Sequence, residues 1–296
     1  MNVDWHQLTR ELSAHYPIGE AKALIRTIQE VRFGLTPVDI CLGKDKQFST
    51  LEREELENIL ERLKKREPIQ YILGSADFGG YTFTVNPSVL IPRPETEELV
   101  NWICAESPIQ NPQILDIGTG SGCIAITLKK RMTESQVTAF DISKEALKTA
   151  QQNAENLQAK VTFCETDILK YLPEQRANSS NKDYEKNTSP SCSEQWDIIV
   201  SNPPYICTDE AQDMDSQVLE HEPHTALFVP NTDPLLFYRA IGHYALTHLH
   251  PGGLLFFEIN QVYGRETKEL LEHLGLKQVE IRRDLYERER MIKCVR

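Results

Sequence analysis

Apolar residues recur every three or four positions through the first 70 residues, a spacing typical of amphipathic helices. The repeat occurs in three stretches: Trp5, Leu8 and Leu12; Ala21, Leu24, Ile25, Ile28 and Val31; and Leu56, Ile59, Leu60 and Leu63. The third stretch follows Ser49-Thr50-Leu51-Glu52, whose Ser and Glu match the capping box that begins many helices. We therefore predict a small helical domain over residues 1–70.

The pattern changes after this domain. From Tyr81 to Val85, apolar and polar residues alternate with the period of a β-strand, and Gly79-Gly80 and Asn86-Pro87 predict turns on either side. We expect residues 71–92 to form a β-hairpin linker that joins the helical domain to the rest of the chain.

From residue 112 onward, short apolar runs alternate with helical stretches. The runs predict buried strands at Ile114–Ile117, Val137–Phe140, Val161–Cys164, Ile198–Val200 and Leu254–Ile259. Helices are expected near 122–131, 143–157, 234–249 and 263–274, and two further strands at Lys277–Arg283 and Met291–Val295. This order predicts an α/β fold, in which residues 93–296 form a seven-stranded, doubly wound, Rossmann-like sheet with a hairpin at its end. Residues 174–195 are polar and lack apolar periodicity, so we expect a flexible surface insertion.

Composition and charge narrow the class of protein. The chain of 296 residues has a formal net charge of −12, which argues against bulk binding to nucleic acid because such proteins usually carry a basic surface. Seven cysteines are scattered without a Cys-x-x-Cys pair, so neither a zinc site nor a disulfide framework is predicted. We see no signal peptide and no apolar run long enough to span a bilayer. We expect a cytoplasmic, monomeric protein without a membrane partner.

A glycine-rich segment follows the first strand of this sheet. It consists of Gly118, Thr119, Gly120, Ser121 and Gly122, and it leads into a helix. Such a loop lets a ligand approach the backbone closely. It is not the dinucleotide fingerprint, because Cys123 occupies the position of the third glycine. A tight turn without a ligand remains the alternative.

Two carboxylates are spaced for binding a nucleoside. Asp141 ends the next strand about 20 residues after the glycine loop, where a carboxylate can accept hydrogen bonds from both hydroxyls of a ribose. Asp167, just past the third strand, is placed to meet the edge of an adenine. For each residue the alternative is a cap at the start of the following helix.

The most specific segment is Asn202-Pro203-Pro204-Tyr205, directly after a buried strand. An amide nitrogen is a poor nucleophile because its lone pair is delocalised. A site that methylates it must accept hydrogen bonds from both of its N–H groups and pack a side chain against the planar amide. The side-chain oxygen of Asn202, a carbonyl fixed by Pro203 and Pro204, and the ring of Tyr205 have that chemistry. A proline-rich turn with a capping Asn is the alternative.

These segments, together with IPRPETEELV, EPHTAL and PGGLLFFEI, resemble the glutamine-N5 methyltransferases that modify peptide-chain release factors. The resemblance covers nearly the whole chain. It implies that Gly118–Gly122 and Asp141 hold S-adenosylmethionine, with S-adenosylhomocysteine as the product, and that Asn202–Tyr205 hold the glutamine of a Gly-Gly-Gln loop. It also implies substrate recognition by residues 1–70.

The chain departs from that family at three places. Ile168 stands where some members have an aromatic residue, Glu287 stands where glycine is common, and the insertion at 174–195 is longer than usual. None of these touches the residues of methyl transfer.

Three other functions share some of these sequence features. An adenine-N6 methyltransferase is the alternative, because its motif is similar to Asn202–Tyr205. The intact Asn202–Tyr205 motif disfavours a noncatalytic nucleotide-binding module. A dehydrogenase is disfavoured because Cys123 replaces the third glycine of the dinucleotide fingerprint. His221-Glu222-Pro223-His224 suggests metal ligands only superficially, because the proline prevents the helix that would align them, so we assign no metal.

Overall fold

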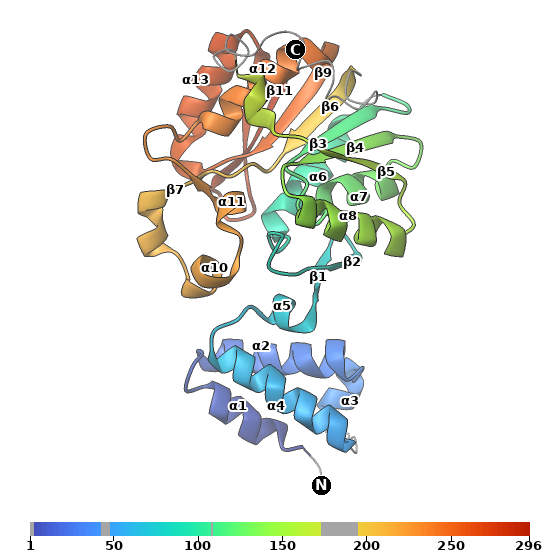
Figure 1. Cartoon of the computed structure of the whole chain (residues 1–296), viewed down its shortest axis with the longest axis vertical. Coiled ribbons are helices and arrows are strands. Elements are labelled where there is room, and N and C mark those ends of the chain that lie inside the picture. The colour runs from blue at the N-terminus through green and yellow to red at the C-terminus, as the bar shows by residue number, and fades with distance from the viewer. Residues whose placement is uncertain (1–2, 43–47, 108, 173–194) are drawn as a thin grey trace. The chain divides into compact units, whose positions relative to one another are not determined.

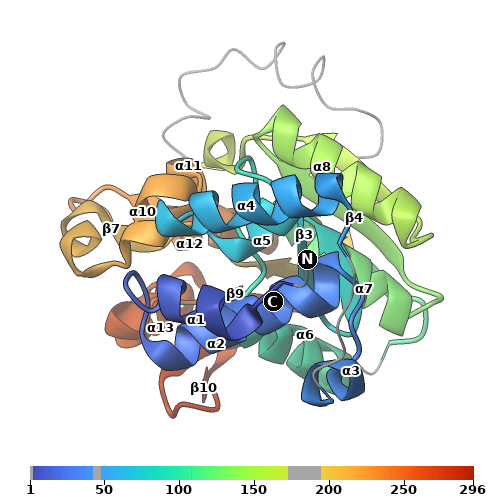
Figure 2. The same cartoon turned by 90° about the horizontal axis from the view of Figure 1, so that it is seen from below.

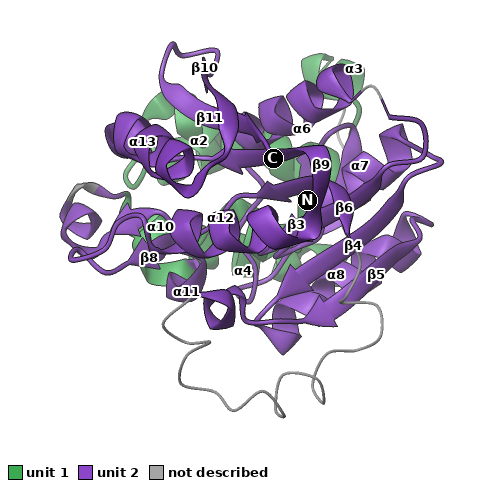
Figure 3. Cartoon of the chain, turned by 90° about the horizontal axis from the view of Figure 1, so that it is seen from above, with its two compact units in different colours: residues 1–75, 215–221 green, residues 76–214, 222–296 purple. Residues whose placement is uncertain are grey.

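The computed structural model describes residues 3–42, 48–107, 109–172 and 195–296. They form two compact units, coloured separately in Figure 3. One comprises residues 1–75 with 215–221, and the other comprises residues 76–214 with 222–296. The predicted insertion at 174–195 lies outside the described residues except for Gln195.

The first unit is helical, as predicted. Its α-helices, labelled in Figures 1 and 2, are α1 (Trp5–Leu12), α2 (Ile18–Thr27), α3 (Pro37–Cys41), α4 (Thr50–Lys64) and α5 (Ile69–Leu73). A π-helical turn, η1 (Ile28–Arg32), follows α2. Ser49 caps α4 by accepting from the backbone of Glu52, whose carboxylate in turn accepts from the Ser49 backbone, so the capping box is confirmed. The apolar faces of α1, α2 and α4 meet in one core.

One position of the predicted apolar stripe is wrong. Ala21, Leu24, Ile25 and Ile28 are buried, whereas Val31 is 52% exposed. The helix widens into a π-turn at Ile28, and the wider turn rotates the following residues away from the α-helical phase. Periodicity of 3.6 residues therefore fails after Ile28.

A segment distant in the sequence completes this unit. Residues 215–221, which include α10 (Ser216–His221), pack with the N-terminal helices. Arg66 forms an ion pair with Asp215 at 3.5 Å, and Gln217 donates to the hydroxyl of Tyr16 over 3.4 Å. Nothing in the hydrophobic pattern of residues 215–221 indicated this partnership.

The second unit contains the predicted seven-stranded sheet, in the order β10-β11-β9-β6-β3-β4-β5. The five strands from β9 to β5 are parallel, and β11 and β10 extend the sheet as an antiparallel hairpin. The strands are β3 (Gln113–Ile117), β4 (Gln136–Asp141), β5 (Val161–Glu165), β6 (Trp196–Ser201), β9 (Leu249–Glu258), β10 (Lys277–Arg283) and β11 (Glu289–Val295). All seven predicted strands are confirmed.

Helices cover both faces of this sheet, and side chains from successive strand residues enter different cores. Ile198 and Val200 pack on one face with α6 (Pro94–Glu106), α7 (Cys123–Arg131) and α8 (Lys144–Asn156). Ile199 packs on the other face, with α12 (Leu236–His248) and α13 (Gly264–Leu274). A parallel strand buried on both sides explains the unbroken apolar run that predicted it.

Shorter elements complete the second unit. The hairpin predicted within residues 71–92 is present as β1 (Ser75–Phe78) and β2 (Tyr81–Thr84), whereas residues 71–73 belong to helix α5. The other short elements are η2 (Ile168–Tyr171), β7 (Ile206–Cys207), η4 (Thr208–Asp213), α11 (His224–Leu227), β8 (Phe228–Val229) and η5 (Gln261–Tyr263). Within the described ranges, no helix combines the length and the apolar character needed to cross a bilayer.

Candidate functional site

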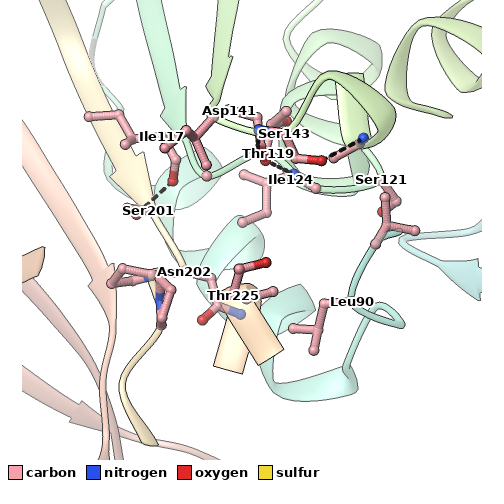
Figure 4. A pocket seen from close by; sticks show the side chains of 18 of the residues that line it. Leu90, Ile117, Thr119, Ser121, Ile124, Asp141, Ser143, Ser201, Asn202 and Thr225 are labelled. Atoms are coloured by element: carbon pink, nitrogen blue, oxygen red, sulfur yellow. Dashed lines mark hydrogen bonds between the residues drawn. The ribbon is translucent and has the colours of Figure 1, made fainter. Parts of the chain in front are cut away.

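The sheet order places a crevice at the carboxyl ends of its central strands. From β3 the chain moves outward through β4 to β5, and it returns to the other side of β3 as β6. Such a reversal leaves space between the loops that follow the two diverging strands, where α/β sheets bind their ligands. A cavity of about 310 Å³ lies there, a size suited to a small molecule (Figure 4).

The glycine loop forms one wall of this cavity. Gly118, Thr119, Gly120 and Ser121 line it. Gly118 and Gly120 have φ angles of +76° and +55°, which side-chain-bearing residues rarely adopt. A Cβ on Gly120 would meet no atom within 4 Å, so the loop leaves open space directly against its backbone.

Gly122 has a different role. It is not among the lining residues. A Cβ there would lie 2.9 Å from Ile126 Cδ1 and 3.2 Å from the Cβ of Ala150 on α8. The glycine therefore permits close packing of α7 against α8.

A buried carboxylate beneath the loop was not assigned a role from the sequence. Asp116 Oδ2 accepts from Thr119 Oγ1 at 2.7 Å and from the Ala125 backbone at 3.2 Å, which ties the loop to β3 and α7. Its Oδ1 has no hydrogen-bond partner among the described residues. Burial raises the pKa of Asp116 to about 7, although these two hydrogen bonds act in the opposite direction. Asp116 lies in the predicted buried strand Ile114–Ile117, but its hydrogen bonds to Thr119 and Ala125 are evident only in the folded loop.

Asp141 lies at the end of β4 on the cavity wall. Its two oxygens accept from the backbone N–H groups of Gly120 and Ser143, each at 2.9 Å. The cap of α8 is Ser143, whose hydroxyl accepts from Ala146, so Asp141 is not the cap that the alternative interpretation required. Burial raises the pKa of Asp141, and the backbone donors act against that rise. Each carboxylate oxygen still has a lone pair for a further donor.

Asp167 lines the same cavity and also caps a helical turn. Its Oδ1 accepts from the backbone of Leu169 at 3.0 Å, at the start of η2. Both interpretations of this residue are therefore compatible with its position. Ile142, also on the wall, is 62% exposed and presents an apolar surface beside Asp141.

The segment after β6 enters the cavity from the opposite side of β3. Asn202, Pro203 and Pro204 line it, and Ser201 Oγ donates to the Ile117 carbonyl over 2.6 Å to hold β6 against β3 (Figure 4). Tyr205 is not among the lining residues, and its hydroxyl instead donates to Glu258. The structure thus brings together three residues of the predicted motif with the glycine loop and Asp141.

A chain of hydrogen bonds connects the side chain of Asn202 to residues of α6 and β9. Asn202 Nδ2 donates to Thr96 Oγ1 at 3.2 Å, and Thr96 Oγ1 donates to Glu258 Oε2 at 2.6 Å. Tyr205 Oη donates to Glu258 Oε1 at 3.0 Å. We call the four residues Asn202, Thr96, Glu258 and Tyr205 the buried relay. Thr96 comes from α6 and Glu258 from the end of β9, and sequence reasoning assigned neither a role.

The neighbouring loops are tied down in similar ways. Glu222, 4% exposed, forms an ion pair with Arg93 and accepts from the backbone of Ile91 at 3.3 Å. Asn260 donates to the Tyr205 carbonyl at 3.1 Å and to Glu210. These contacts hold the loops on both sides of the motif, and they join segments that are far apart in the sequence.

Among the described residues, no group of three or more His, Cys, Asp or Glu side chains is arranged to hold a metal ion. Glu222 of the suspected metal segment is paired with Arg93, and His224 stacks edge-on against Phe228.

Two family models match the chain. Residues 110–259 match a methyltransferase domain, and residues 5–74 match the PrmC N-terminal domain. The first range contains β3, β4, β6 and the loops after them, which line the cavity together with residues between 88 and 96, and the second range lies within the helical unit.

Individual proteins are similar to this chain over most or all of its length. A release factor glutamine methyltransferase from Bacteroides thetaiotaomicron is 44% identical over 100% of both chains. One from Flavobacterium psychrophilum is 42% identical over 97% of this chain and 96% of its own. The crystal structure of a methyltransferase from Pyrococcus furiosus is 18% identical, covers 81% of this chain and 98% of its own, and has a TM-score of 0.51, so it bears on the fold alone.

Proposed function

Because the chain belongs to the release factor glutamine methyltransferase family, we propose that it methylates the side-chain nitrogen N5 of the Gly-Gly-Gln glutamine in release factors. The observation that carries the proposal is the meeting of Asn202, Pro203 and Pro204 with the glycine loop and Asp141 around one cavity.

The methyl donor is S-adenosylmethionine, whose positively charged sulfonium supplies an electrophilic methyl group. The cavity fits such a molecule on three counts. Gly118 and Gly120 leave space against the loop backbone, Asp141 offers carboxylate oxygens to ribose hydroxyls, and Ile142 offers an exposed apolar surface to the adenine. We propose that Gly118–Ser121, Asp141 and Asp167 hold the donor. Gly122 contributes by packing α7 against α8.

The Asn202 segment is proposed to hold the methyl acceptor. An amide nitrogen attacks poorly because its lone pair is shared with the carbonyl. The Asn202 side-chain oxygen and the Pro203 carbonyl would each accept one N–H of the target, which aligns the lone pair with the methyl group. The nitrogen would form its bond to the methyl carbon as the bond from that carbon to sulfur breaks, which leaves S-adenosylhomocysteine, and the proton that the nitrogen loses would pass to solvent. Pro203 and Pro204 restrict the backbone, so the carbonyl is fixed before substrate binds. Tyr205 packing against the target amide stays a prediction.

The helical unit is proposed to recognise the release factor, and the chain is proposed to act in the cytoplasm during translation termination. The match of residues 5–74 to the PrmC N-terminal domain supports the first of these. The net charge of −12 supports a protein rather than a nucleic acid as the partner.

A labelling experiment tests the proposal. The chain would be incubated with S-adenosylmethionine labelled in its methyl group and with one of three substrates: a release factor, the same factor with its Gly-Gly-Gln glutamine changed to glutamate, or an adenine-containing oligonucleotide. We expect label only on the unaltered factor, because a carboxylate has no nitrogen to methylate. Label on the oligonucleotide alone would refute the proposal in favour of adenine methylation.

A further inference from the structure

Thr96, which also lines the cavity, and Glu258, which does not, are almost completely buried, at 3% and 2% exposure. We propose that they are positioning residues, which orient the Asn202 amide so that its oxygen, and not its nitrogen, faces the methyl acceptor. The inference rests on the proposed function, because it concerns the acceptor of that reaction.

The orientation of Asn202 follows from counting protons along the buried relay. A threonine hydroxyl carries a single proton, and Thr96 donates it to Glu258 Oε2 across 2.6 Å. The Thr96 oxygen can therefore only accept from Asn202, which turns the Asn202 NH₂ group toward Thr96. The amide is planar, so its oxygen is directed away from Thr96.

Glu258 keeps this arrangement because each of its oxygens accepts from a hydroxyl, one on Thr96 and one on Tyr205. Burial raises the pKa of the Glu258 carboxyl, while these two donors and the nearby Arg290 guanidinium act against the rise. Only a carboxylate accepts at both oxygens. A neutral amide in its place would present NH₂ to one of the two hydroxyls.

The consequence of a flipped Asn202 is severe. If an amide NH₂ at position 258 faced Thr96, the threonine proton would turn toward Asn202 and favour its oxygen there. The Asn202 NH₂ would then face the NH₂ of the target glutamine, and two donors cannot form a hydrogen bond. The target nitrogen would no longer be aligned with the methyl group. The site for the methyl donor, formed by Asp141 and the glycine loop, would stay intact.

Substitutions of Thr96 separate positioning from packing. Thr96→Val keeps the shape and removes the hydroxyl, and we expect kcat to fall by about 10- to 100-fold, the loss typical of a misaligned reacting group. The affinity for S-adenosylhomocysteine should change less than about 3-fold, since no ribose contact is altered. Thr96→Ser retains the hydroxyl and should recover most of kcat. Glu258→Gln should resemble Thr96→Val in kcat.

Thr127→Val is the matched control. Thr127 is fully buried on α7, and its hydroxyl has no hydrogen-bond partner in the part of the chain that the structure describes. It is not a lining residue of the cavity. Equal activity in this variant and the unaltered chain would show that losing a buried hydroxyl is not by itself damaging.

A double-mutant cycle tests whether Thr96 acts through Asn202. If it does, Thr96→Val added to Asn202→Ala should cause little further loss, because the amide that it orients is already absent. If the kcat losses of the two single variants multiply in the double variant, the inference is overturned. An unchanged kcat in both Thr96→Val and Glu258→Gln would also overturn it.

The last measurement does not require turnover. Nuclear magnetic resonance reports the side-chain NH₂ of Asn202, which is identified by its absence from the Asn202→Ala spectrum. Thr96→Val should shift this signal, whereas Thr127→Val should not. An unmoved signal would refute the orientation whatever the substrate. A shifted signal in a chain that leaves release factor unlabelled would instead count against the proposed function alone.

Discussion

Asp116 provides a test of the electrostatics beneath the cofactor loop. The carboxyl is completely buried between β3 and α7, and one of its oxygens has no partner among the described residues. Burial raises its pKa from 3.8 to about 7. The folded chain therefore retains a proton on Asp116 over a pH range in which the unfolded chain has lost it. We expect Asp116→Asn to remove this dependence on pH.

The sign and size follow from linkage between folding and proton binding. Between pH 4 and 7 the folded state binds more protons at this site, so the contribution of Asp116 to stability falls as the pH rises. With the two pKa values above, the unaltered chain should lose roughly 2–3 kcal/mol of unfolding free energy at this site between pH 5 and pH 8. Asp116→Asn has no such titration, so its stability relative to the unaltered chain should rise by that amount.

Denaturant unfolding at a series of pH values measures this difference. Trp102 and Trp196 are both buried in the second unit, so tryptophan fluorescence reports its unfolding. Asp77→Asn is the control, because it removes an equal charge from an exposed position of the same unit. A stability difference between Asp116→Asn and the unaltered chain that stays constant from pH 5 to pH 8 would refute the reasoning.

Three further predictions concern the site. Asp141→Ala should weaken S-adenosylhomocysteine binding by roughly 1–3 kcal/mol, since charge-assisted hydrogen bonds are lost, and unchanged calorimetric affinity would contradict its role. Asn202→Ala should lower kcat by about 100-fold or more while calorimetry finds near-normal cofactor affinity; a loss confined to cofactor binding would contradict the assignment. Gly122→Ala should destabilise the second unit by about 1–2 kcal/mol more than Gly80→Ala, judged by chemical unfolding. Both glycines have positive φ, but only at Gly122 would the Cβ clash, so equal effects would show that packing is not the cause.

The fold was largely predictable because local signals agreed with the tertiary structure. The central parallel strands β3, β4 and β6 are apolar runs buried on both faces, and Ser49 begins its helix as its capping box predicts. The prediction that Val31 lies on the apolar face was wrong because a π-turn changes the phase of the helix. The spacing of apolar residues contains no sign of that turn.

The site residues that could be predicted are those whose position next to a strand is visible in the sequence. Asp141 is the last residue of its strand, and Gly118, Gly120 and Asn202 closely follow theirs, so the topology of a parallel sheet brings them together. The relay residues Thr96 and Glu258 come from a helix and a strand 162 residues apart. Their pairing depends on side-chain packing, which no spacing rule describes.

Location of the methyl group on the product tests the central claim most directly. Release factor incubated with the chain and S-adenosylmethionine would be digested and analysed by tandem mass spectrometry. The account predicts a mass gain of one CH₂ on the side chain of the Gly-Gly-Gln glutamine, and a far smaller modified fraction after the same time when Asn202→Ala replaces the unaltered chain. An unmodified glutamine in a reaction that consumes S-adenosylmethionine, with the methyl group found elsewhere, would contradict it.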